Sequence, residues 1–109
     1  PPFPNPGYWM YTGDMPVVHI SPLDPNSPPR TNPEGMGKGF DHFAMWGSGY
    51  EAQMTVLEKY GIEYSQRLAG GGRVIQVFFH DPNGVQIELG FDPEAEGITR
   101  DTIKGKIHE

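Results

Sequence analysis

The fold is decided by the stretch RVIQVFFHDPNGVQIEL, which occupies residues 73–89. Residues 73–79 are rich in β-branched and aromatic side chains, which favour a strand. The sequence DPNG follows at residues 81–84 and fits a type I turn, with Asp first, Pro second and Gly fourth. Residues 85–89 then alternate apolar and polar side chains. The stretch therefore predicts a β-hairpin that carries Glu88 in its second strand.

The segment before this hairpin predicts a helix at about residues 49–60 and a strand at 63–67. Ser48 and Glu51 have the spacing of a capping box, in which both side chains bond to free amides at a helix start. The apolar stripe expected to face the core consists of Ala52, Val56 and Tyr60, with Leu57 beside them.

A further strand is predicted at residues 39–46, where a period of two divides the side chains between two faces. One face would carry Phe40, His42, Ala44 and Trp46, and the other Asp41, Phe43 and Met45. Phe40, Trp46 and, in the hairpin, Phe78 are expected in the core or on the wall of a substrate cavity. His42 therefore shares its face with aromatic rings.

The Pro-rich first third of the chain predicts loops around a single hairpin, with strands at residues 8–11 and 16–20. Residues 22–38 are expected to form a surface connection. The tail at 92–109 is only weakly patterned, although Ile98, Ile103 and Ile107 can pack against a neighbour, and we assign it no chemistry. Because the sequence opens without Met in a Pro-rich segment, we expect the natural N-terminus to lie upstream.

An internal repeat relates the two predicted hairpins. Residues 8–21 align without gaps over residues 77–90, turn over turn and apolar position over apolar position. This alignment places His19 over Glu88. Two side chains that are able to bind a metal therefore occupy the same position of the repeat.

The order of strand, helix and three strands, ending in DPNGVQIEL, resembles the βαβββ module of the vicinal-oxygen-chelate superfamily of glyoxalases, extradiol dioxygenases and bleomycin resistance proteins. The resemblance covers residues 39–91. It implies an α+β fold in which paired βαβββ modules curl mixed sheets around a central cavity. Within one domain over 1–109, residues 1–21 would be the remainder of an incomplete first module, 22–38 a linker and 92–109 a tail.

The resemblance also implies a metal site. His42 matches the family's first-strand ligand, Glu88 matches the last-strand ligand, and His19 matches the last-strand position of the other module. Together they would hold one divalent ion of Fe, Mn, Ni, Co or Zn, which two imidazoles and a carboxylate suit. Two adjacent substrate oxygens would then chelate this ion and be polarised by it. As alternatives, His19 would cap the end of its strand or donate to a carboxylate beside the metal.

Other polar side chains are weaker candidates for the site. Alternation along the strands permits Tyr64 or Gln76 to act as a proton relay or as an orienting group. His80 is expected near the turn, outside the ligand set. Arg73 is left out because an isolated exposed Arg is usually only solvated.

The overall composition excludes several classes of partner. A net charge of -6 at pH 7 and the absence of a Lys/Arg cluster argue against nucleic acid. No apolar run approaches the roughly 20 residues that span a membrane. With no Cys, any metal must be bound by nitrogen or oxygen. We expect a soluble, cytoplasmic homodimer that acts on a small molecule, because incomplete modules leave sheet edges to cover.

Three functions fit these patterns. The first is a metal-dependent lyase or dioxygenase of the vicinal-oxygen-chelate type. The second is a non-catalytic ligand-binding module that resembles bleomycin resistance proteins and holds no metal. The third is a fragment of the fold whose chemistry depends on an N-terminal half outside this sequence.

Overall fold

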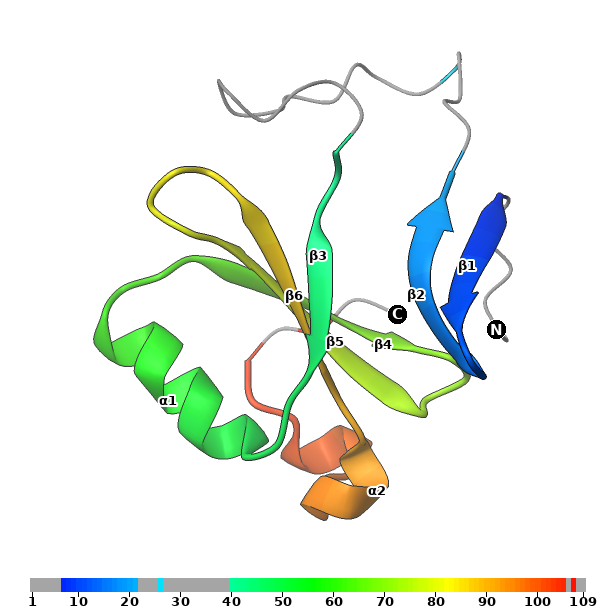
Figure 1. Cartoon of the computed structure of the whole chain (residues 1–109). Coiled ribbons are helices and arrows are strands. Elements are labelled where there is room, and N and C mark those ends of the chain that lie inside the picture. The colour runs from blue at the N-terminus through cyan, green and yellow to red at the C-terminus, as the bar shows by residue number, and fades with distance from the viewer. Residues whose placement is uncertain (1–6, 22–25, 27–39, 106, 108–109) are drawn as a thin grey trace. The chain divides into compact units, whose positions relative to one another are not determined.

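The computed structural model describes residues 7–21, 26, 40–105 and 107. The chain forms two compact units, Pro1–Thr31 and Asn32–Glu109, whose positions relative to one another are not determined (Figure 1). Over the described residues the fold is α+β, with a two-stranded antiparallel sheet and a four-stranded mixed sheet, neither of them closed. None of the helices in this part of the chain is long and apolar enough to cross a membrane.

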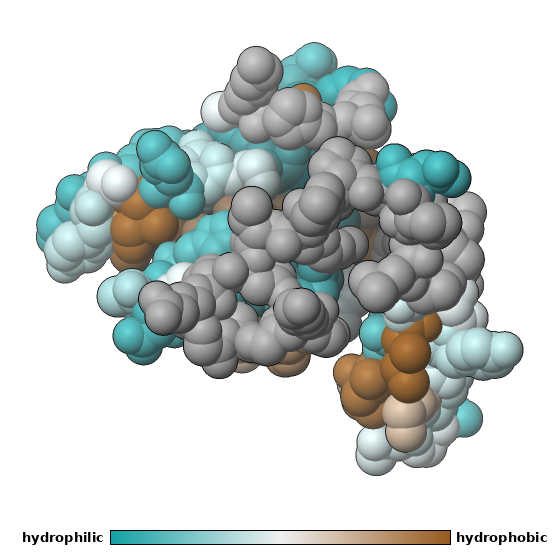
Figure 2. All heavy atoms as spheres, turned by 90° about the horizontal axis from the view of Figure 1, so that it is seen from above, coloured by the Kyte–Doolittle hydropathy of each residue, from teal (hydrophilic) through white to brown (hydrophobic). Residues whose placement is uncertain are grey.

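The first unit contains the predicted hairpin. Strands β1 (Tyr8–Thr12) and β2 (Met15–Ile20) pair in antiparallel fashion, with a register shift between Met10 and Tyr11. Most of the large apolar side chains of this hairpin are exposed, and they form the hydrophobic area on the right of Figure 2. Because a two-stranded hairpin is marginal by itself in water, this unit depends on further packing for its stability.

The second unit is built from one mixed sheet and its covering helices. Its elements are β3 (Phe43–Trp46), α1 (Tyr50–Lys59), β4 (Tyr64–Ala69), β5 (Val74–His80), β6 (Gln86–Phe91), α2 (Pro93–Glu96) and the 3-10 helix η1 (Arg100–Thr102). The strand order is β3-β6-β5-β4. Strand β3 runs parallel to β6, whereas β5 is antiparallel to both β6 and β4.

The hairpin predicted from residues 73–89 is confirmed as β5 and β6. In its turn the Gly84 N–H donates to the Asp81 carbonyl oxygen at 2.9 Å. The Asp81 side chain accepts from the backbone N–H groups of Asn83 and Val85, each at 2.8 Å. Gly84 has φ 86°, a conformation that side chains with a Cβ rarely adopt. Turn chemistry therefore fixes the register of this hairpin locally.

The predicted strand at residues 39–46 is only half correct. Residue 39 lies outside the described part of the chain, and β3 begins at Phe43. Phe40 and Trp46 are 43% and 68% exposed, so the expectation that they lie in the core is wrong. The described residues 40–42 precede the strand, and strict alternation does not apply to them.

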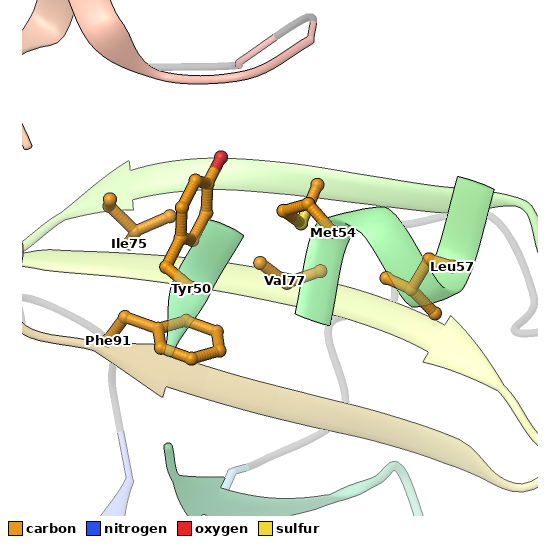
Figure 3. Packing of buried hydrophobic residues seen from close by; sticks show 6 residues of the cluster. All are labelled: Tyr50, Met54, Leu57, Ile75, Val77 and Phe91. Carbon is orange, nitrogen blue, oxygen red and sulfur yellow. The ribbon is translucent and has the colours of Figure 1, made fainter. Parts of the chain in front are cut away.

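Helix α1 covers one face of the mixed sheet (Figure 3). Three helix residues at i, i+4 and i+7 pack against three sheet residues, and the cluster comprises Tyr50, Met54, Leu57, Ile75, Val77 and Phe91. Of the stripe predicted from the sequence only Leu57 is buried, whereas Val56 is 45% and Tyr60 68% exposed and Ala52 is exposed as well, so the prediction is wrong for these three residues. The helix has two rows of apolar residues with helical spacing. In the folded protein the row that starts at Tyr50 faces the sheet.

The buried amide of Gln66 sits at the centre of this packing, with 1% of its surface exposed. Its Oε1 accepts from the Tyr50 hydroxyl at 2.7 Å, and its Nε2 donates to the Lys104 carbonyl oxygen. Both ends of the amide are therefore satisfied, as a buried polar group requires. The tail supplies this carbonyl, and its Ile98 and Ile103 pack on the core, as expected for two of the three isoleucines.

Burial raises the pKa of Tyr50 above its ordinary value of 10.0. The folded state thus favours the neutral phenol, so this contribution to stability is complete below pH 10 and is lost as the pH rises through the raised pKa. We expect the free energy of unfolding to fall above about pH 10, and to fall less steeply in Tyr50→Phe. Denaturant titrations at several alkaline pH values measure both slopes. Tyr60→Phe, at an exposed ring, is the control and should follow the wild-type profile.

The start of α1 is capped over a long range rather than locally. The N-cap residue is Gly49, with φ 77°, and no side chain of the predicted capping box bonds there, so that prediction is wrong. Instead, the Glu96 carboxylate of α2 accepts from the backbone N–H groups of Gly49 at 3.2 Å and Tyr50 at 2.7 Å. A negative charge at a helix N-terminus satisfies free amides and complements the helix dipole.

Replacing Glu96 by Ala should lower the free energy of unfolding by about 1 kcal/mol, the usual value for the loss of an N-terminal cap. Chemical denaturation at neutral pH measures this loss. The control is Glu94→Ala, which removes the same charge from an exposed position of the same short helix. Equal losses in the two variants would show that the cap contributes nothing of its own.

Candidate metal centre

The face of the mixed sheet opposite α1 carries two of the three predicted ligands, His42 and Glu88. Along β6 the side chains alternate, so Leu89 packs on the core while Glu88 lies on the other face. Only 14% of the Glu88 side chain is exposed. A carboxylate that is this well covered needs partners, because burying an unpaired charge is costly.

His42 is the first partner of this carboxylate. It stands immediately before β3, which runs beside β6, and Ala44 of β3 is in register with Glu88. The Nε2 atom of His42 lies 3.0 Å from Oε1 of Glu88. The parallel pairing of β3 with β6 thus brings together two residues that are 46 positions apart in the sequence.

Each of these two side chains is held by a second group. Nδ1 of His42 is hydrogen-bonded to the Asp41 carboxylate. The other Glu88 oxygen, Oε2, accepts a hydrogen bond from Gln76 Nε2 at 3.3 Å. The rings of His42 and Phe78 form a T-shaped contact, with centroids 5.9 Å apart and an interplanar angle of 79°. These contacts orient Nε2 and Oε1 toward one another.

The donor set of this pair fits a divalent cation. A neutral imidazole has one N–H, and if Nδ1 donates to Asp41, the Nε2 lone pair faces the acceptor Oε1 of Glu88. Two acceptors 3.0 Å apart are reconciled by a cation that binds both. A ring protonated on both nitrogens would satisfy the same contacts without a cation, since it donates to both carboxylates.

His19, the third predicted ligand, lies in β2 of the first unit. Its ring stacks on Trp9, with centroids 4.2 Å apart and planes 3° from parallel, and its Nε2 is 3.4 Å from Ser21 Oγ. Since the units are not placed relative to one another, its ligation remains a prediction. Among the described residues, no group of three or more His, Cys, Asp or Glu side chains is arranged to hold a metal ion.

The two hairpins of the predicted repeat share a cross-strand register only away from their turns, because Tyr11 pairs with Pro16 whereas the aligned His80 pairs with Gln86. In the first hairpin Trp9 is paired with His19, and in the second Phe78 is paired with Glu88, at the aligned positions. Two further aligned pairs agree in the same way, Tyr8↔Ile20 with Val77↔Leu89 and Met10↔Val18 with Phe79↔Ile87. Each hairpin therefore sets an aromatic ring directly across from its candidate site residue.

The remaining sequence candidates fall on different sides of the sheet. Gln76 contacts Glu88 and is thus an orienting group, as the alternation permitted. Tyr64 packs on the core side instead, with its hydroxyl 3.5 Å from Glu58 Oε1, which argues against a relay at this site. His80 ends β5 beside the turn and is exposed, as expected, whereas His108 lies outside the described residues.

The sequence reasoning missed Asp41, which was expected on the face away from His42. The sequence feature that could have indicated Asp41 is its position directly before the candidate imidazole of His42. No family model, curated protein or solved structure matches the chain. The geometry of His42 and Glu88 is therefore the basis for inferring a function.

Proposed function

We propose that this protein is a metal-dependent enzyme of the vicinal-oxygen-chelate type, in which His42 and Glu88 hold a divalent cation that binds a small-molecule substrate. The observation that carries the proposal is the 3.0 Å approach of His42 Nε2 to Glu88 Oε1, with each residue oriented by a second partner. The element order from β3 to β6 supports it, because the family's βαβββ module has the same order.

The side chains of this site have distinct roles in the proposal. Asp41 holds Nδ1 of His42 and so keeps the Nε2 lone pair available as a ligand. Gln76 binds Oε2 of Glu88 and leaves Oε1 as the ligand atom. A bound cation would supply Lewis-acid polarisation of two adjacent substrate oxygens. Phe78 makes a T-shaped ring contact with the imidazole and helps to hold it in place.

Titration of the chelator-treated protein with Fe²⁺, Mn²⁺, Ni²⁺, Co²⁺ and Zn²⁺ tests the proposal. Isothermal titration calorimetry should show one site per chain for at least one of these ions. Dioxygen uptake with catechols then separates a dioxygenase from a lyase. Failure of all five ions to bind would contradict the metal-dependent function.

Two predictions from the sequence accompany this proposal. His19 is proposed as a third ligand, and His19→Ala is then expected to weaken binding of the same ion. Paired modules around a cavity and a homodimeric assembly are also proposed. Sedimentation equilibrium of the protein in solution tests the dimer.

A non-catalytic ligand-binding module is the second candidate. It is favoured by the fact that an imidazolium at His42 would satisfy both Asp41 and Glu88 without a metal. In that case small-molecule binding should persist in the presence of a chelator. His42→Ala should also leave that binding nearly unchanged.

A further inference from the structure

A row of residues crosses the site-bearing face of the mixed sheet. Strand register aligns Trp46 of β3 with Gly90 of β6, Gly90 with Gln76 of β5, and Gln76 with Arg67 of β4. Side chains that are directly opposite one another in a sheet share a face. Arg67 therefore lies on the same face as Gln76, and Gln76 is hydrogen-bonded to Glu88.

In the middle of this row Gly90 has no side chain, and the Trp46 ring lies against it, 3.4 Å from the position that a Cβ would occupy, which is an ordinary van der Waals contact. The neighbouring row of the same face contains Glu88 itself, with Phe78 opposite it and Ser65, a small side chain, opposite Phe78. Trp46, 68% exposed, stands at one end of the row and Arg67 at the other.

Arg67 is exposed and forms no hydrogen bond or ion pair within the part of the chain that the structure describes. No ion pair joins Arg67 to the Glu88 carboxylate, whose two oxygens contact His42 and Gln76. Neighbouring strands are about 4.8 Å apart, so β4 lies about 10 Å from β6, a distance that a small molecule and an Arg side chain bridge together.

The net charge of the whole chain gives the position of the Arg67 guanidinium a meaning for ligand binding. With a net charge of -6 at pH 7, the protein repels anions in general. A guanidinium on the site-bearing face provides a local exception, and its planar fork suits carboxylate and phosphate groups.

We propose that the substrate of this site carries a second anionic group, a carboxylate or a phosphate, which Arg67 binds while the vicinal oxygens occupy the cation held by His42 and Glu88. This inference rests on the proposed function. It defines the substrate class as small acids with a chelating end and a separate anionic end.

Matched pairs of small acids test this class. The Ni²⁺-loaded protein is titrated with 2-oxoglutarate and with 2-oxovalerate, which share the chelating end and differ in the distal carboxylate. The phosphate arm compares 3-phosphoglycerate with glycerate. We expect the doubly anionic member of at least one pair to bind about tenfold more tightly, the usual scale of a charge-assisted hydrogen bond.

Two variants assign this preference to its residue. Arg67→Met should abolish the preference without changing the affinity for Ni²⁺ itself. Arg73→Met removes the same charge from an exposed position before β5 and should keep the preference. Equal affinities within both pairs, retention of the preference in Arg67→Met, or its loss in Arg73→Met would overturn the inference. Failure of the wild-type protein to bind Ni²⁺ or any of the other ions would instead overturn the proposed function, and the inference with it.

Discussion

Replacing His42 by Ala is expected to lower the affinity for the divalent cation by more than about 100-fold, because the loss of an outer-shell partner alone costs about 10- to 100-fold. The substitution removes the Nε2 atom that lies 3.0 Å from Glu88 Oε1. It also leaves Asp41 without the imidazole that it orients. Calorimetric titration of wild type and variant with the same ion measures the change.

The control for this experiment is His80→Ala. His80 is also an imidazole of the second unit, but it is exposed at the end of β5 and outside the predicted ligand set. Its loss should leave cation affinity within about twofold of wild type, as for surface substitutions in general. Circular dichroism of both variants verifies the fold. A His42→Ala protein that binds the cation as tightly as wild type would exclude His42 as a ligand.

The elements that were predicted correctly are those with local signals. The turn at residues 81–84 is specified by Asp81, whose side chain bonds to two following amides, and by the positive φ of Gly84. The contacts that fix this hairpin lie within a few residues of one another. The sequence alone therefore shows where β5 ends and β6 begins.

The buried face of α1 could not be read in the same way. Val56 and Tyr60 fit a helical period as well as Met54 and Leu57 do, so periodicity permits either stripe to face the sheet. The choice depends on Tyr50, whose hydroxyl finds a buried acceptor on Gln66 of β4. That acceptor becomes visible only once the strands are paired, because burial of a hydroxyl without a partner is unfavourable.

The sequence predicted the two principal residues of the candidate site, His42 and Glu88. It did not predict Asp41, which is hydrogen-bonded to His42. The family resemblance marked His42 and Glu88, the repeat marked Glu88 as well, and the parallel pairing of β3 with β6 brings the two residues together. Asp41 was assigned to the wrong face because residues 40–42 precede the strand and need not alternate. Glu96, which caps α1 from 46 residues away, carries no local signal at all.

Replacing Phe91 by Ala should cause the largest loss of stability of any change considered, about 3–5 kcal/mol, as is usual for removing a buried phenyl ring. Phe91 is fully buried, and its ring packs edge-on against Tyr50, with centroids 5.4 Å apart. Gly47 approaches so closely that an added Cβ would lie 2.8 Å from the ring. The surrounding residues come from α1, β5 and the loop after β3, so they cannot collapse together into the space left by the ring.

Phe43→Ala is the matched control for this loss, because it removes the same ring from a position that is 40% exposed on the edge strand β3. We expect its cost to be less than half that of Phe91→Ala, since less apolar area returns to water and no closed cavity remains. Urea denaturation of the two variants and wild type gives both free energies. Equal losses would mean that the packing of α1 on the sheet does not dominate the stability of this unit. In that case the sheet that carries His42 and Glu88 on its opposite face would be stabilised mainly by other contacts.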